Sequence, residues 1–195
     1  MNFHFRINTN NHIGIGHLMR TFRIATKLQK NGNKCFFYLD YNLRFKNILN
    51  NFKTFNLYKK NIKFINQSND AKLFLNSVYT KEGIVVVDDY RLNHVWEKKV
   101  SYKNYKIVVI DDLINNKHFC DYYINAKPDY YLKSNFNHKN ILKKNCKMLI
   151  GPNYNMIDCT KKNKSQNNFF NLLFYNGGGG NLKQIYNIIK GILEI

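Results

Sequence analysis

The sequence has no apolar run long enough to cross a membrane. Its longest apolar stretches, such as 84–87 and 172–175, fall far short of the roughly 20 residues that a spanning helix needs. The first residues carry no secretory pattern, because polar residues from Asn8 to His12 interrupt any apolar segment. We therefore expect a soluble, cytoplasmic protein without membrane insertion.

Cysteine is scarce, and its spacing excludes the common zinc and redox motifs. The four cysteines stand at positions 35, 120, 146 and 159. No two of them form a Cys-x-x-Cys pair, and no cluster of Cys and His has zinc-ligand spacing. Reduced, mostly buried thiols are the expected state.

Acidic residues are few, since 12 Asp and Glu face 31 Lys and Arg and give a net charge of +19. A basic surface attracts phosphates. The chain is also rich in Asn, Lys, Ile, Phe and Tyr, which A/T-rich codons encode, so genome composition explains much of the charge. No helix-turn-helix, zinc-finger or RNP1-like segment is present, and we expect no specific nucleic-acid partner.

What is present is a hydrophobic fraction of 44%, enough for a real core, arranged in an α/β pattern. A short alternating strand at 3–7 is followed by a glycine-bearing turn and by apolar residues at helical spacing over 18–28. Gly32 is placed to end that helix as a left-handed cap. Further strands are predicted at 35–39, 62–65, 84–87, 107–110, 122–124 and 148–150, and further helices at 45–52, 70–80 and 92–102. Alternating strands and helices of this kind predict a Rossmann-like parallel sheet.

The end of the chain repeats the opening pattern. Residues 160–168 are wholly polar and are typical of a linker. An apolar segment, a run of four glycines and a helix over 182–193 follow. We predict a complete domain at 1–159, the linker at 160–168, and at 169–195 the first strand-loop-helix unit of a truncated second domain.

The turn Gly14-Ile15-Gly16-His17 is the first segment that can carry chemistry. Glycines before a helix let the backbone approach a ligand, and the helix N-terminus offers free N–H groups to an anion. His17 falls in the first helical turn, where the helix dipole disfavours the imidazolium and favours a neutral base. An ordinary tight turn with a capping histidine explains the same residues.

Two further strands end in acids, Asp88-Asp89-Tyr90 and Asp111-Asp112. Because ligands of open α/β sheets bind outside the carboxyl ends of the strands, these groups should share one rim with the glycine turn. There they can bind sugar hydroxyls, or they can merely cap the following helices.

The glycine run at 177–180 suits a diphosphate at a helix N-terminus, or forms a flexible loop. It is no Walker loop, because Asn181-Leu182 stands where Lys-Ser/Thr is needed.

Together, four motifs in order resemble a known family. They are Gly-Ile-Gly-His-Leu-Met-Arg at 14–20, Val-Val-Asp-Asp-Tyr-Arg-Leu at 86–92 with Trp96-Glu97, Val-Ile-Asp-Asp-Leu at 109–113 with His118, Cys120-Asp121 and Asn125, and Gly-Pro-Asn-Tyr at 151–154. The set is similar to the UDP-2,4-diacetamido-2,4,6-trideoxy-β-L-altropyranose hydrolases of pseudaminic acid biosynthesis. Those enzymes are related to MurG-type glycosyltransferases of GT-B fold.

The resemblance implies two Rossmann-like domains facing a cleft, with UDP held mainly by the C-terminal one. It implies hydrolysis at the anomeric carbon of a UDP-linked sugar, with no metal and no cofactor. By this resemblance His17 is the general base and Tyr90 a second catalytic residue. The remaining expected site residues are, for the substrate, Gly14, Gly16, Arg20, Asp89, Asp112 and Asn125, and, for the diphosphate of UDP, Gly177, Gly178, Gly179 and Gly180.

Two other functions fit the same motifs. A related GT-B glycosyltransferase would use the same cleft with an acceptor other than water. A truncated, non-catalytic remnant would only hold the nucleotide-sugar. In each case we expect a monomer whose partner is the UDP-sugar itself.

Overall fold

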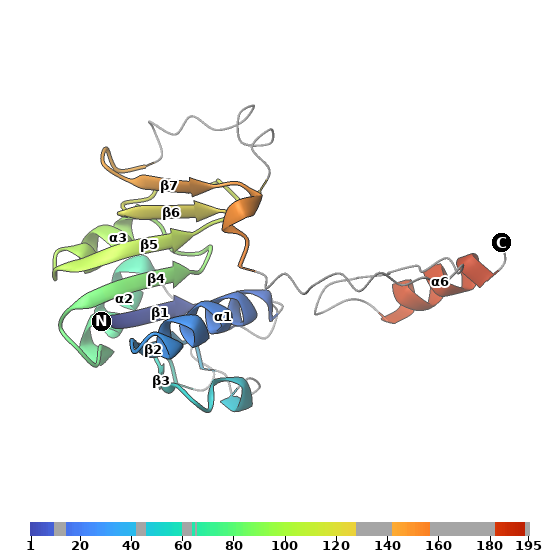
Figure 1. Ribbon diagram of the computed structural model, residues 1–195, viewed down its shortest axis with the longest axis horizontal. Helices are drawn as coiled ribbons and strands as arrows, with labels where there is room; N and C mark the ends of the chain where they lie inside the picture. The colour runs from blue at the N-terminus through green and yellow to red at the C-terminus, as the bar shows by residue number, and fades with distance from the viewer. Residues whose placement is uncertain are drawn as a thin grey trace.

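The computed structural model describes residues 1–9, 15–41, 46–59, 64, 66–127, 142–156 and 182–193. The described residues form a seven-stranded sheet in the order β3-β2-β1-β4-β5-β6-β7, and every neighbouring pair is parallel (Figure 1). The strands are β1 (Asn2–Ile7), β2 (Lys34–Leu39), β3 (Lys53–Asn56), β4 (Gly83–Asp88), β5 (Tyr105–Ile110), β6 (Tyr122–Asn125) and β7 (Lys147–Ile150). This is the Rossmann-like parallel sheet that the sequence predicted.

The helices cover both faces of the sheet. The chain steps from β1 to β2 in one direction and from β4 to β5 in the other, and right-handed crossovers then require helices on opposite faces. Accordingly α1 (Gly16–Lys30) packs on one face, while α2 (Gln67–Ser77) and α3 (His94–Ser101) pack on the other. Two short 3-10 helices, η1 (Lys46–Leu49) and η2 (Pro152–Tyr154), and the terminal α6 (Leu182–Leu193) complete the described elements.

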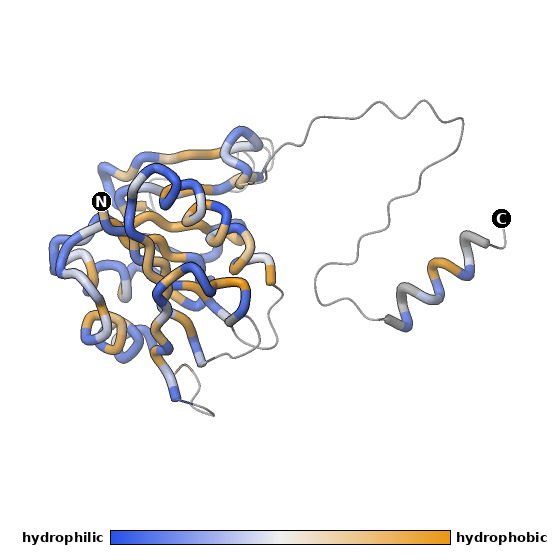
Figure 2. The backbone as a smooth tube through the Cα atoms, turned by 60° about the horizontal axis from the view of Figure 1, so that its bottom comes forward, coloured by the Kyte–Doolittle hydropathy of each residue, from blue (hydrophilic) through white to orange (hydrophobic). Residues whose placement is uncertain are grey.

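Each face has its own hydrophobic core, and Figure 2 shows the hydrophobic segments running along the strands between more hydrophilic turns. Phe5 and Ile7 of β1 join Leu18 and Ala25 of α1 on one face. The opposite face is centred on Trp96 of α3 and on residues of α2 and the alternate strand positions. The order in which successive strands join the sheet changes direction between β1 and β4, so the carboxyl ends of these two strands lie at the topological switch point of the sheet.

The structure confirms the helix cap at Gly32, whose φ of +78° is in the left-handed region. The structure also has a strand that the sequence did not predict, β3 at 53–56. The predicted strand at 62–65 lies outside the described residues, apart from residue 64. β3 is an edge strand with mostly exposed residues, so it lacks the apolar run that marks a central strand. The expected helix over 45–52 contains only the short η1.

The predicted second domain is described only in its helix α6. The linker 160–168 and the glycines 177–180 lie outside the described residues, as does Gly14. Among the described helices, none has the length and apolar character that crossing a bilayer demands.

Candidate functional site

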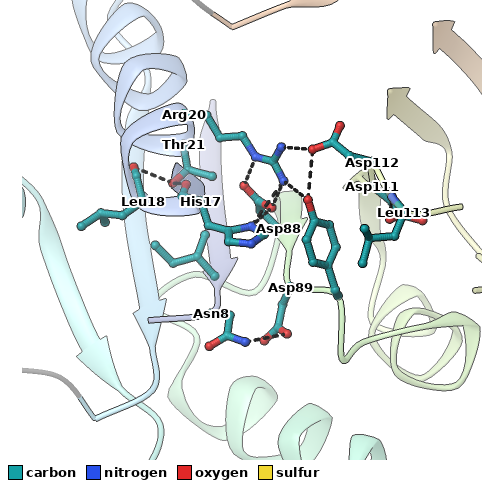
Figure 3. A network of polar contacts seen from close by, with 12 residues as sticks. Asn8, His17, Leu18, Arg20, Thr21, Asp88, Asp89, Asp111, Asp112 and Leu113 are labelled. Atoms are coloured by element: carbon teal, nitrogen blue, oxygen red, sulfur yellow. Dashed lines mark hydrogen bonds and ion pairs between the residues drawn. The ribbon is translucent and has the colours of Figure 1, made fainter. Parts of the chain in front are cut away.

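A group of polar side chains gathers at the carboxyl ends of β4 and β5, beside the N-terminus of α1 (Figure 3). His17 and Arg20 lie in the first two turns of α1. Asp88 is the last residue of β4, and Asp112 follows β5 by two residues. The switch point of the sheet therefore brings Arg20 into contact with Asp112, which lies 92 positions further along the sequence.

Arg20 is the centre of this group. Its Nε and Nη2 atoms each lie 2.5 Å from a carboxylate oxygen of Asp88, so the two residues form a bidentate pair. Its Nη1 atom donates to Asp112, and its Nη2 atom lies 3.3 Å from the hydroxyl of Tyr90. Burial opposes the charge of Arg20, but the hydrogen bonds and charges of Asp88 and Asp112 outweigh it and raise its pKa. The guanidinium is therefore held in one position by two carboxylates.

His17 is oriented by the same carboxylate. Its Nδ1 atom lies 2.6 Å from Oδ1 of Asp88, whose side chain is fully buried. A carboxylate oxygen only accepts, so Nδ1 carries the hydrogen, and the approach of Arg20 Nη2 at 3.3 Å is a close contact rather than a second hydrogen bond. No described residue hydrogen-bonds to Nε2. When the ring is neutral, its lone pair is therefore at Nε2, which is the geometry of an oriented base.

Tyr90 closes the group on the side of β5. Its hydroxyl donates to Oδ2 of Asp112 at 3.0 Å, and its ring packs edge-on against His17 with centroids 4.6 Å apart. Burial, the largest effect, raises the pKa of Tyr90 to about 12. The residue is thus a neutral phenol near pH 7 and acts as a hydrogen-bond donor.

A cavity of about 480 Å³ adjoins this group along α1. Arg20 and Asp112 belong to its wall, whereas His17 and Tyr90 do not. Gly16 also lines it, and a Cβ atom added to Gly16 would meet no other atom within 4 Å. The cavity and the His17 group therefore share Arg20 and Asp112 as a common boundary.

Each pair of adjacent aspartates is divided between the two faces of the sheet. Asp88 and Asp112 lie on the α1 face with Arg20, while Asp89 and Asp111 lie on the face of α2 and α3. Figure 3 shows Asp89 turned away from Asp88 and placed beside Asn8. The division follows from the pleat, because successive residues of a strand point to opposite faces.

Asp89, expected in the substrate site, takes part in an ion-pair network on the second face. Its oxygens accept from Arg91 at 2.5 and 2.8 Å, and Arg91 also reaches Asp40 at 2.8 Å. The fully buried Arg6 forms a bidentate pair with the fully buried Asp70 at 2.6 and 3.0 Å. Each charged side chain of this network has a partner of opposite charge, which is typical of ion pairs that stabilise a fold.

Four further motif residues also lie on that face. Trp96 donates to Asp70 at 2.8 Å, and the Glu97 carboxylate lies 2.6 Å from His118 Nδ1. Cys120 is buried, with its sulfur 3.5 Å from that of Cys146. The cysteines at 35, 120 and 146 are free thiols. These motif residues support the sheet and the following loops rather than the group around His17.

Asn125, the last residue of β6, is fully buried. Its Oδ1 atom accepts from the backbone of Lys127 at 2.9 Å, and its Nδ2 atom has no hydrogen-bond partner among the described residues. It lies beside Ala126, which lines the cavity. Asn125 is therefore close to the candidate site without belonging to the His17 group.

The residue that sequence reasoning left out of the expected site is Asp88. The signal that could have found it is the alternation of β4, since Val86 packs on the α1 face and Asp88 follows it by two positions.

Among the described residues, no cluster of three or more His, Cys, Asp or Glu side chains is arranged to hold a metal ion. Comparison with protein-family models, curated proteins and solved structures gives no match for this chain.

Proposed function

We propose that this chain binds a nucleotide-activated sugar at the carboxyl rim of the sheet and hydrolyses the bond between the anomeric carbon and UDP. The observation that carries the proposal is the contact of 2.6 Å between Asp88 and His17 Nδ1, which leaves Nε2 open at the switch point of a parallel sheet. The resemblance of the ordered motifs to UDP-diacetamido-trideoxy-sugar hydrolases supplies the substrate class.

In the proposed reaction, Nε2 of His17 takes a proton from a water molecule as its oxygen attacks the anomeric carbon. The carbon–oxygen bond to the diphosphate breaks, and UDP leaves with the bonding electrons. UDP is a stable anion, so a dedicated general acid is dispensable, unlike in most glycosidases. Asp88 holds the ring in the required tautomer and stabilises the imidazolium that forms.

The side chains next to His17 have different roles in the proposed reaction. The partly exposed Asp112 offers an acceptor to the hydroxyl or amide groups of a sugar, and the Tyr90 hydroxyl, whose hydrogen is donated to Asp112, offers its oxygen as a further acceptor. Arg20 fixes both carboxylates, so that Asp88 and Asp112 keep their spacing when a ligand enters. A rigid set of donors and acceptors is what orients a sugar for in-line attack.

The test is UDP release from UDP-2,4-diacetamido-2,4,6-trideoxy-β-L-altropyranose by the wild-type chain and by the His17→Ala variant. We expect the variant to lose roughly 10²- to 10⁴-fold in kcat. His94→Ala is the matched control, because His94 is exposed at the start of α3 and should leave the rate unchanged. Equal rates for His17→Ala and wild type would show that His17 is not the general base.

The acceptor is identified by the product. In water enriched in oxygen-18, hydrolysis places the label on the anomeric carbon of the free sugar. If the sugar is instead transferred to an added acceptor without taking up the label, the chain is a glycosyltransferase that uses the same site.

A further inference from the structure

The cavity beside the His17 group has an unusual charge distribution. Its wall is mostly apolar and comes from α1, the ends of β5 and β6, and the segment after η2. The lining residues are Ile15, Gly16, Met19, Arg20, Arg23, Ile110, Asp112, Ala126, Asn155 and Met156. Two of them are arginines and only one is an acid, so the wall carries an excess of positive charge.

The uncompensated positive charge of the wall is that of Arg23. Arg20 is held by Asp88 and Asp112, and the remaining hydrogen bond to Asp112 comes from Tyr90. Arg23 is half-buried at the cavity wall and forms no ion pair or hydrogen bond with any described residue. The first turn of α1 contributes no acidic residue either. The guanidinium of Arg23 is thus the charge at this wall that no carboxylate of the described part of the chain pairs with.

A half-buried cation without a partner loses part of its hydration and gains nothing in return, so it is stabilised by an anionic ligand. The planar guanidinium offers five donors in a fork that matches the oxygens of a phosphate. The apolar side chains around it favour a ligand that also has uncharged surface. Both properties together describe a phosphate ester of an organic group rather than a free inorganic ion.

We propose that Arg23 binds the phosphate-bearing part of the ligand in this cavity, with Ile15, Met19 and Met156 against its uncharged part. This inference rests on the proposed function, since it names the residue that holds the charged part of the same substrate. Arg20 and Asp112 belong both to the cavity wall and to the His17 group, so the phosphate subsite adjoins the group that contains the base.

The test follows the side-chain Nε–Hε resonances of the arginines by NMR while inorganic pyrophosphate, UDP or uridine is added to the chain. We expect pyrophosphate and UDP to shift the Arg23 resonance and uridine to leave it unchanged. Arg23→Met, which removes the charge and keeps most of the chain length, should weaken pyrophosphate binding by about tenfold or more. Arg23→Lys should give an intermediate loss, because the charge stays and the fork is absent.

Lys30→Met is the matched control, since Lys30 is exposed in the last turn of the same helix and the charge change is identical. We expect it to bind pyrophosphate like wild type. An equal loss in Lys30→Met, which would indicate general attraction to a basic surface, overturns the inference. So does wild-type affinity in Arg23→Met, or the absence of any binding of both pyrophosphate and UDP by the wild-type chain.

Failure of this inference differs from failure of the proposed function. If pyrophosphate binds through Arg23 but no UDP is released from the sugar nucleotide, only the hydrolase proposal fails. If UDP is released and Arg23→Met keeps the wild-type KM and kcat, only the phosphate subsite fails.

Discussion

We predict that the folding stability of this chain depends on pH through His118, which lies on the face of the sheet covered by α2 and α3. Its Nδ1 atom lies 2.6 Å from Oε1 of Glu97, and its Nε2 atom lies 3.3 Å from Oδ2 of Asp111. Both ring nitrogens face carboxylates, so the ring is an imidazolium. Burial lowers the pKa of His118, but hydrogen bonds and charges from Asp111 and Glu97 outweigh burial and raise it to about 9.

The magnitude follows from linkage. The pKa of His118 is about 9 in the folded chain and 6.5 in its ordinary state, and this difference corresponds to about 3 kcal/mol of folding free energy. Because the folded pKa is the higher one, this stability is fully present below pH 6.5 and is lost as the pH rises through about 9. The side chain is only 3% exposed, so solvent screens the interaction little.

The assay is urea denaturation followed by circular dichroism, from about pH 6 to about pH 10, with wild type and His118→Gln. The variant should be less stable at the acid end. The free energy of unfolding of the wild type should fall more steeply with pH, by about 3 kcal/mol in total. Titration of other groups occurs in both chains and cancels in the difference. Parallel pH profiles for the two proteins would refute the reasoning.

Three further outcomes are expected. Asp88→Asn should lower kcat by about 10²-fold or more with little change in KM, because an amide can hold His17 in the wrong tautomer; steady-state kinetics checks this, and an unchanged kcat contradicts it. Asp70→Ala should cost about 3–5 kcal/mol in a denaturation experiment, because it leaves the buried Arg6 short of a partner; a loss below about 1 kcal/mol would be inconsistent. A thiol reagent should modify Cys146 before Cys35, because the hydrogen bond from Cys120 lowers the pKa of Cys146, whereas burial raises the pKa of Cys35 to about 11. Peptide mapping gives the order of modification, and modification of Cys35 first would contradict the prediction.

The central part of the fold could be read from local patterns. β4 and β5 are short, continuous β-branched runs, which only a strand buried on both faces explains economically. The glycine turn, the helical spacing after it and Gly32 identified α1 and its end. Parallel strands place their carboxyl ends on one rim, so the neighbourhood of His17, Tyr90 and Asp112 followed from the predicted order of strands and helices.

Other features had no local signal. β3 lies at the edge of the sheet, where a strand needs no apolar run, and its polar residues resemble a loop. The network of Arg6, Asp70 and Asp40 joins residues 34 and 64 positions apart, which no short pattern connects. Such contacts depend on which face each helix covers.

The sequence by itself determined a parallel α/β sheet with a histidine, a tyrosine and two pairs of acids at its carboxyl rim. Tertiary structure decided which acid of each pair joins the histidine. The pleat sends neighbouring residues to opposite faces, and only the packing of α1 on one face made Asp88 and Asp112 the partners of His17 and Arg20. The same packing left Asp89 and Asp111 to ion pairs under α2 and α3.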